Sequence, residues 1–153
     1  MQTQFHPDMI SADVIVDLVG VAWQTFVGVE PIPVGDVDLP AASVSASISI
    51  GGPWQGTVLL HCSRTVAVGA AEATLGIPAA ELDEADVSDI LGELANILGG
   101  NLKGFASADE SGWTLSLPVV SAGDQIVPGS RGLVRVGFSC EGEPLVCEVR
   151  EHA

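Results

Sequence analysis

Apolar residues recur at helical spacing in three stretches of the chain. The first runs from Ile10 to Val29, and Ser11 at its start is a candidate N-terminal cap. The second, Thr65 to Leu75, stops at Gly76, a residue type that suits the left-handed conformation beyond helix ends. The third opens with the acidic stretch from Glu81 and runs to about Lys103, since negative charge is favoured at a helix N-terminus. The pattern predicts two long helices and a shorter one.

Strand periodicity occurs between and after these helices. From Ser43 to Ile50 apolar residues alternate with serines, which predicts a strand with one polar face. A glycine-rich turn follows, and Gln55 to His61 is the predicted return strand of a hairpin. The residues from Pro31 to Pro40 are rich in Pro, Gly and Asp and predict a connector, and residues 109–112 predict a loop. Three further strands are predicted at Trp113–Val120, Leu133–Cys140 and Leu145–Arg150.

This order of elements predicts an α+β fold in which the two long helices and the short one pack on one face of a mixed or antiparallel sheet. A helix followed by antiparallel strands occurs twice, which indicates a pseudo-duplicated architecture. The length of 153 residues suits one domain, and no linker divides the chain. We therefore expect a single domain over residues 1–153.

The charge balance excludes two classes of partner. Five Lys and Arg residues stand against twenty Asp and Glu residues, which gives a net charge of −15. Nucleic acids and anionic membranes both require a basic surface, so neither is an expected partner. The most apolar segment, from Val14 to Val29, is about 16 residues long and shorter than a membrane-spanning helix. With three cysteines in no metal-type spacing and no signal peptide in view, we expect a soluble, cytoplasmic protein.

The common catalytic signatures are absent from the sequence. It contains no nucleophile elbow, dinucleotide fingerprint or phosphate-binding loop motif. His61 and Cys62 are neighbours on a predicted strand, so their side chains point to opposite faces and cannot share a metal ion. Because the three histidines are scattered, neither a transition-metal site nor a histidine-based catalytic triad is predicted.

The third predicted helix is the most informative segment. Its apolar residues form one buried stripe, and its polar and small residues follow steps of four and three on the opposite side. These polar and small residues are Asp89, Glu93, Asn96, Gly100 and Lys103. Several glycines weaken the helix, each by up to about 1 kcal/mol relative to Ala, and close approach by another backbone would explain them. From spacing alone, the polar stripe is either a docking surface or an ordinary solvated helix face.

Taken whole, the segment resembles the CheX/CheC family of chemotaxis phosphatases. The resemblance rests on Asp89, on Glu93 after three intervening residues and on Asn96 after two more, with Gly100-Asn101-Leu102-Lys103 beyond them. A second block, Leu115 to Gly123, follows at the distance that the family pattern requires. The similarity extends over most of residues 5–150 and implies a CheX-like domain.

The resemblance implies an enzyme that hydrolyses the aspartyl phosphate of a CheY-like response regulator in chemotaxis. By this resemblance, Asn96 of this chain would orient the attacking water, and Glu93 would contact the active-site Lys of the regulator. Gly100 would leave room for the loops of the partner, Asp89 would shape the edge of the site, and Pro118 would end or bend a strand. The phosphatase would need no cofactor of its own, because the regulator carries the Mg²⁺.

The first helix contains no Asn, so the resemblance implies one site per subunit and a homodimer like that of CheX. Two other interpretations stay open. One is a non-catalytic module that docks onto a response regulator or a flagellar-switch component. The other is an assembly domain whose polar stripe is solvated surface.

Overall fold

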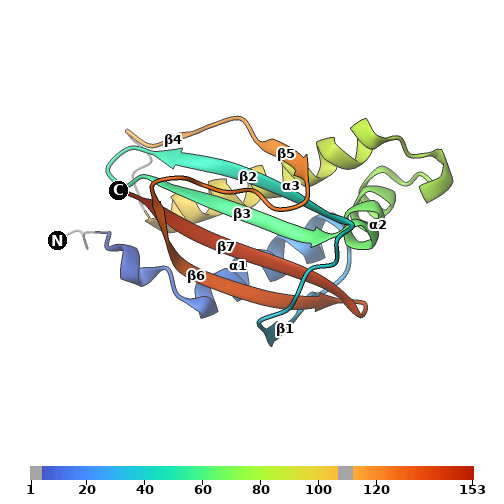
Figure 1. The fold of residues 1–153 in the computed structure, drawn as a ribbon, viewed down its shortest axis with the longest axis horizontal. Coiled ribbons are helices and arrows are strands. Elements are labelled where there is room, and N and C mark those ends of the chain that lie inside the picture. Colours follow the sequence, from blue (N-terminus) through green and yellow to red (C-terminus); the bar gives the residue numbers. More distant parts are fainter. Residues whose placement is uncertain (1–4, 107–111) are drawn as a thin grey trace.

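The computed structural model describes residues 5–106 and 112–153, and in it the helices pack on one face of a seven-stranded sheet (Figure 1). Every strand pairing found between described residues is antiparallel. The α+β class predicted from the sequence is confirmed. The helical elements are η1 (Pro7–Met9), α1 (Ala12–Phe26), α2 (Arg64–Leu75), η2 (Ala79–Glu81) and α3 (Glu84–Ala106). The strands are β1 (Ile32–Gly35), β2 (Ser43–Gly51), β3 (Gly56–Ser63), β4 (Thr114–Leu115), β5 (Val119–Ala122), β6 (Ser130–Cys140) and β7 (Glu143–His152).

The sheet has an approximate two-fold arrangement of its two sequence halves. The strand order is β1-β6-β7-β3-β2, with both β4 and β5 paired to the far side of β2. The β2–β3 hairpin of the first half therefore lies beside the β6–β7 hairpin of the second, and β3 pairs with β7 at the centre. Each half also gives an edge strand to the other, since β1 pairs with β6 and β5 pairs with β2. The two halves therefore have the same arrangement of hairpin and edge strand, in agreement with the predicted pseudo-duplication.

Side-chain and backbone caps explain where the helices begin and end. Ser11 Oγ accepts from Val14 N at the start of α1, and Gly76, with φ of 67°, closes α2. At α3, Asp83 Oδ1 accepts from Asp86 N at 2.8 Å, while the side chain of Asp86 accepts from Asp83 N at 3.1 Å. The acidic stretch therefore includes a reciprocal capping box as well as charges favourable to the helix dipole.

Two predicted elements differ from the structure. The connector contains a short strand, β1, because an edge strand tolerates the missing N–H group of Pro33. The single strand predicted at Trp113–Val120 is two strands, β4 and β5, which are separated at Pro118. The predicted loop at 109–112 lies outside the described residues except for Gly112.

The principal core lies between the helices and the sheet. Its fully buried side chains include Trp23 of α1, Leu60 of β3 and Leu94 of α3. All three cysteines are free and buried. No helix in the described part of the chain is long and apolar enough to cross a membrane.

The connection from β5 to β6 crosses the face of the sheet that the helices leave open (Figure 1). Ser45 Oγ donates to the carbonyl of Gly123 and also lies 2.7 Å from Nδ1 of the buried His61. Because Ser45 has one hydroxyl proton, His61 Nδ1 must be the donor in the second bond. The side chain of Gln125 continues this attachment by donating to Ser45 O and Val119 O. A buried histidine therefore anchors the connection to the sheet.

Burial lowers the pKa of His61 below its ordinary value of 6.5, and the positive charge of Arg135 acts in the same direction. The carboxylates of Asp124 and Glu148 oppose this shift without overcoming it. The folded protein therefore keeps His61 neutral to a lower pH than the unfolded chain does. Below pH 6.5 the unfolded chain binds the additional proton, so acidification costs the folded state stability.

We predict that His61→Asn reduces the dependence of stability on pH. Between about pH 7 and pH 5, the free energy of unfolding of the wild type should fall more steeply than that of the variant. Urea unfolding at several pH values measures both slopes. The control is Gln24→Ala, a change of an exposed, uncharged side chain, which should keep the wild-type slope. Equal slopes for wild type and His61→Asn would contradict the assignment of this proton uptake to His61.

Candidate functional site

Helix α3 carries the candidate site on the side that it turns away from the core. Its buried face consists of Val87, Leu91, Gly92, Leu94, Ala95, Leu98, Gly99 and Leu102. On the other side Asp89 and Glu93 are exposed, and Asn96 and Gly100 are half-buried. The structure thus brings the four predicted site residues together along one side of a single helix.

Two glycines of α3 allow the helix to approach the sheet closely. A Cβ atom at Gly99 would lie 2.6 Å from Ile48 Cγ2 of β2, which is too close for a real contact. A Cβ atom at Gly92 would lie 3.3 Å from Pro118 Cγ and 3.4 Å from Val120 Cγ2. The expectation that another backbone approaches these glycines is therefore wrong, because side chains of the sheet fill the space. As a result, the block Leu115–Gly123 lies alongside α3.

The side chains of Glu93 and Asn96 have no hydrogen-bond partner within residues 5–106 and 112–153. They are three residues apart on one helix, so they are neighbours on its surface. Their carboxylate and amide groups are therefore available to a second molecule. Gly100, one turn beyond Asn96, would place a Cβ atom 3.9 Å from Leu115 Cδ1, so no steric contact with the fold requires a glycine there.

An exposed apolar residue, Leu117, lies near this helix. It is 86% exposed and precedes Pro118, which packs against Gly92. Val119 is 59% exposed, but it pairs with Ser47 and faces the open side of the sheet, because its neighbour Val120 faces α3. The sequence pattern alone did not distinguish them from core positions of a strand. Side chains of this kind add apolar area to a surface that binds another protein.

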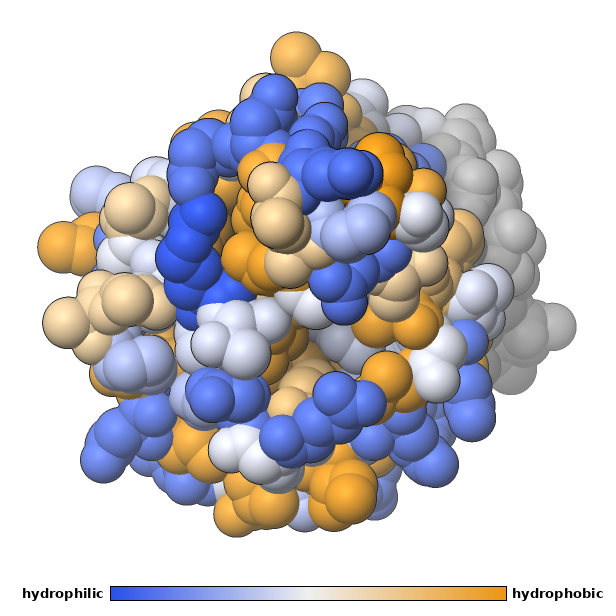
Figure 2. All heavy atoms as spheres, turned by 90° about the vertical axis from the view of Figure 1, so that its right-hand side faces the viewer, coloured by the Kyte–Doolittle hydropathy of each residue, from blue (hydrophilic) through white to orange (hydrophobic). Residues whose placement is uncertain are grey.

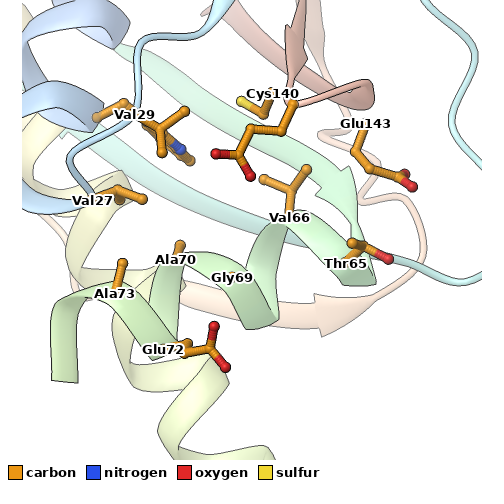
Figure 3. A pocket seen from close by; sticks show the side chains of 12 residues that line it. Val27, Val29, Thr65, Val66, Gly69, Ala70, Glu72, Ala73, Cys140 and Glu143 are labelled. Atoms are coloured by element: carbon orange, nitrogen blue, oxygen red, sulfur yellow. The ribbon is translucent and has the colours of Figure 1, made fainter. Parts of the chain in front are cut away.

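The described residues hold no group of three His, Cys, Asp or Glu side chains that could bind a metal ion. A cleft with several apolar side chains lies away from the polar side of α3, between the end of α1, α2 and the β6–β7 turn (Figure 3). The candidate site itself is a polar helix surface with an exposed apolar residue nearby, and such a surface suits a macromolecular partner.

The comparison with protein families decides the assignment. The model of the family described as "Chemotaxis phosphatase CheX" matches residues 44–139, more than half of the chain, and includes the whole of α3. The chain belongs to the CheX family. No curated protein sequence matches it.

Solved structures of CheX-like proteins share the fold. A CheC-like superfamily protein from Shewanella sp. PV-4 is 24% identical with a TM-score of 0.72, covering 94% of this chain and 100% of that chain. CheX from Vibrio vulnificus is 19% identical with a TM-score of 0.72, covering 90% and 93%. The solved CheX–CheY–BeF₃–Mg²⁺ complex from Borrelia burgdorferi contains a matching chain that is 17% identical with a TM-score of 0.71. The match covers 92% of this chain and 97% of that chain. At these identities the likeness shows the fold.

We predict opposite effects of alanine at two adjacent glycines of α3. Gly99→Ala should lower the free energy of unfolding by about 1–3 kcal/mol, because its Cβ atom would overlap Ile48 and displace the helix from the sheet. Gly100→Ala is the matched control and should leave stability unchanged or raise it by up to about 1 kcal/mol, since Ala favours helix. Urea unfolding measures both changes. A Gly99→Ala protein as stable as Gly100→Ala would show that the close approach is not required.

Proposed function

We propose that the protein hydrolyses the aspartyl phosphate of a CheY-like response regulator. The observation that carries this proposal is the pair formed by exposed Glu93 and half-buried Asn96, neither of which is hydrogen-bonded within the described chain. Membership of the CheX family supports the reaction class. The complex of the Borrelia burgdorferi relative with CheY supports the class of partner.

The proposed chemistry suits the residues that the site offers. Water attacks the phosphorus, the bond from phosphorus to the aspartyl oxygen breaks, and the products are the free carboxylate and inorganic phosphate. An acyl phosphate is already activated, so the phosphatase needs no nucleophile or metal ion of its own and mainly has to position the water. The Mg²⁺ in this proposal belongs to the regulator.

Asn96 is the residue that we assign to the water. A carboxamide can accept a hydrogen bond from the water and donate another to a phosphoryl oxygen, and it does not titrate. Its half-buried place on a helix held tightly to the sheet limits the side-chain entropy lost when the partner binds. Glu93, one turn earlier, would form a charge-assisted contact with the active-site Lys of the regulator and fix its orientation.

The neighbouring residues would complete the docking surface. We assign Asp89 to its polar edge and Gly100 to the space that the loops of the regulator occupy. The exposed Leu117, next to the Pro118 that packs against α3, would supply apolar contact near the catalytic pair. Because the net charge of −15 does not favour long-range attraction to an acidic regulator, apolar contact close to the site would compensate for weak steering.

We also propose that the protein acts in the cytoplasm as a homodimer. Strand β1 is an edge strand whose side chains Ile32 and Val34 are 62% and 49% exposed. An unpaired edge with apolar side chains favours pairing with a second copy.

We predict that Asn96→Ala slows phosphate release from a phosphorylated, Mg²⁺-bound CheY-like regulator by about 100-fold or more, because the attacking water loses its positioning group. Release is measured as inorganic phosphate over time, with circular dichroism to confirm folding. The matched control is Gln24→Ala, which removes an exposed amide from α1 and should keep the wild-type rate.

The same experiment separates the alternative interpretations. If wild type binds the phosphorylated regulator without accelerating release, the protein is a docking module and the catalytic proposal is wrong. If wild type and Asn96→Ala accelerate release equally, the phosphatase activity stands and the role of Asn96 is wrong. If neither binding nor release is observed with any regulator of the organism, the polar stripe is solvated surface.

A further inference from the structure

A cleft of about 280 Å³ lies between the end of α1, helix α2 and the turn that joins β6 to β7. In Figure 3, Val27 and Val29 face Val66 and Ala70 across this cleft, and Cys140 lies along one side. Burial raises the pKa of the Cys140 thiol to about 12, and the charge of Glu141 adds to the shift, so the thiol stays neutral. The interior of the cleft is therefore lined by uncharged and mostly apolar side chains.

Three carboxylates border this apolar interior. Glu72 comes from α2, while Glu141 and Glu143 come from the β6–β7 turn, and no Lys or Arg is among the described residues that line the cleft. Glu72 Oε2 also accepts from Ala79 N at 2.7 Å, which holds that carboxylate in place. Figure 2 views the end of the molecule at which α2 and the β6–β7 turn lie, and hydrophobic patches there are interspersed with hydrophilic groups. The cleft thus combines an apolar interior with a negatively charged rim.

The residue type at position 141 does not suit the backbone conformation there. Cys140 pairs with Glu143, so Glu141 and Gly142 form a two-residue hairpin turn, with φ of 51° and 87°. Such turns favour Asn or Gly at the first position, and a Glu residue in the left-handed region is strained. Strained residues tend to occur at functional sites. This one places a carboxylate on the rim of the cleft.

We propose that this cleft is a docking site for a segment of a partner protein that carries an apolar side chain next to Lys or Arg residues. The volume is slightly below the roughly 300–1,000 Å³ of typical small-molecule pockets, which suits one or two inserted side chains rather than a whole ligand. The three rim carboxylates complement a basic segment. This surface is separate from the exposed side of α3, so a second protein can bind while a regulator is engaged.

Two blocked tetrapeptides are the probes, RLLR and RSSR, followed by NMR of the wild-type protein. RLLR should shift the signals of the Trp23 indole and of the Val27 and Ala70 methyl groups, and RSSR should not. Shifts of equal size with RSSR would reduce the interaction to non-specific attraction by a chain of net charge −15 and overturn the proposal. No shift at these groups with RLLR would also overturn it.

Blocking the cleft tests its apolar part. A Cβ atom at Gly69 meets nothing within 4 Å, so the helix has room for a side chain to begin there, and Gly69→Leu adds apolar bulk to the lining of the cleft while favouring the helix. RLLR binding should be lost in this variant. Gly20→Leu on α1 is the matched control, because its Cβ atom also meets nothing within 4 Å, and it should bind like wild type. Binding that survives Gly69→Leu would contradict the proposed place.

Removing rim charge tests the electrostatic part. Glu141→Asn together with Glu143→Gln should weaken RLLR binding about tenfold. Asp17→Asn together with Glu81→Gln removes two exposed charges elsewhere and should have little effect. Glu141→Asn alone should raise the midpoint of thermal unfolding by a few degrees, because Asn tolerates the left-handed conformation. A variant with weaker binding and a lower midpoint would show a structural role for Glu141 and overturn its assignment to binding.

Discussion

The absence of side chains at Gly92 and Gly99 is the constraint on which the arrangement of this protein depends. Each glycine lets α3 approach side chains of the sheet at a distance that a Cβ atom would prevent or strain. Ile48 and Leu115 pack at one point along the helix, and Pro118 and Val120 at the other. A helix held at two points separated by seven residues can neither roll nor slide freely. The outward direction of Glu93 and Asn96 therefore follows from contacts on the buried face of the same helix.

The sequence predicted the fold class and the polar side of α3 because both follow from periodicity, which is a local property. It also placed the cap Ser11 and the helix end at Gly76 correctly. It did not predict β1, because a proline such as Pro33 argues against a strand and is tolerated only at an edge, and edges are defined by tertiary pairing. The partners of Gly92 and Gly99 were missed for the same reason. A glycine in a helix indicates that something comes close, but only the folded structure shows what does so.

In the candidate site, too, local sequence predicted some features and only the folded structure showed the others. Local spacing predicted that Glu93 and Asn96 are neighbours on the surface, and the structure confirms their common side. Spacing could not show that their side chains form no hydrogen bond with the described residues, nor that Leu117 stays exposed near them. Those properties depend on how β4 and β5 run along β2, more than 60 residues away in sequence. The role of each residue in hydrolysis stays a prediction.

The charge of the chain does not by itself distinguish the two surfaces that we propose as binding sites. All four arginines form ion pairs with carboxylates of the chain: Arg64 with Glu84, Arg131 with Glu151, Arg135 with Asp36 and Glu148, and Arg150 with Glu148. With five Lys and Arg residues against twenty Asp and Glu residues, negative surface is the general condition and cannot by itself select a partner. Selection then depends on the uncharged groups that accompany the carboxylates. Beside Glu93 this group is the amide of Asn96, which can orient a water molecule. Beside Glu141 it is an apolar cleft, which can hold a side chain. One pseudo-symmetric framework thus presents two acidic surfaces that differ in chemistry, and the difference arises from a few uncharged residues.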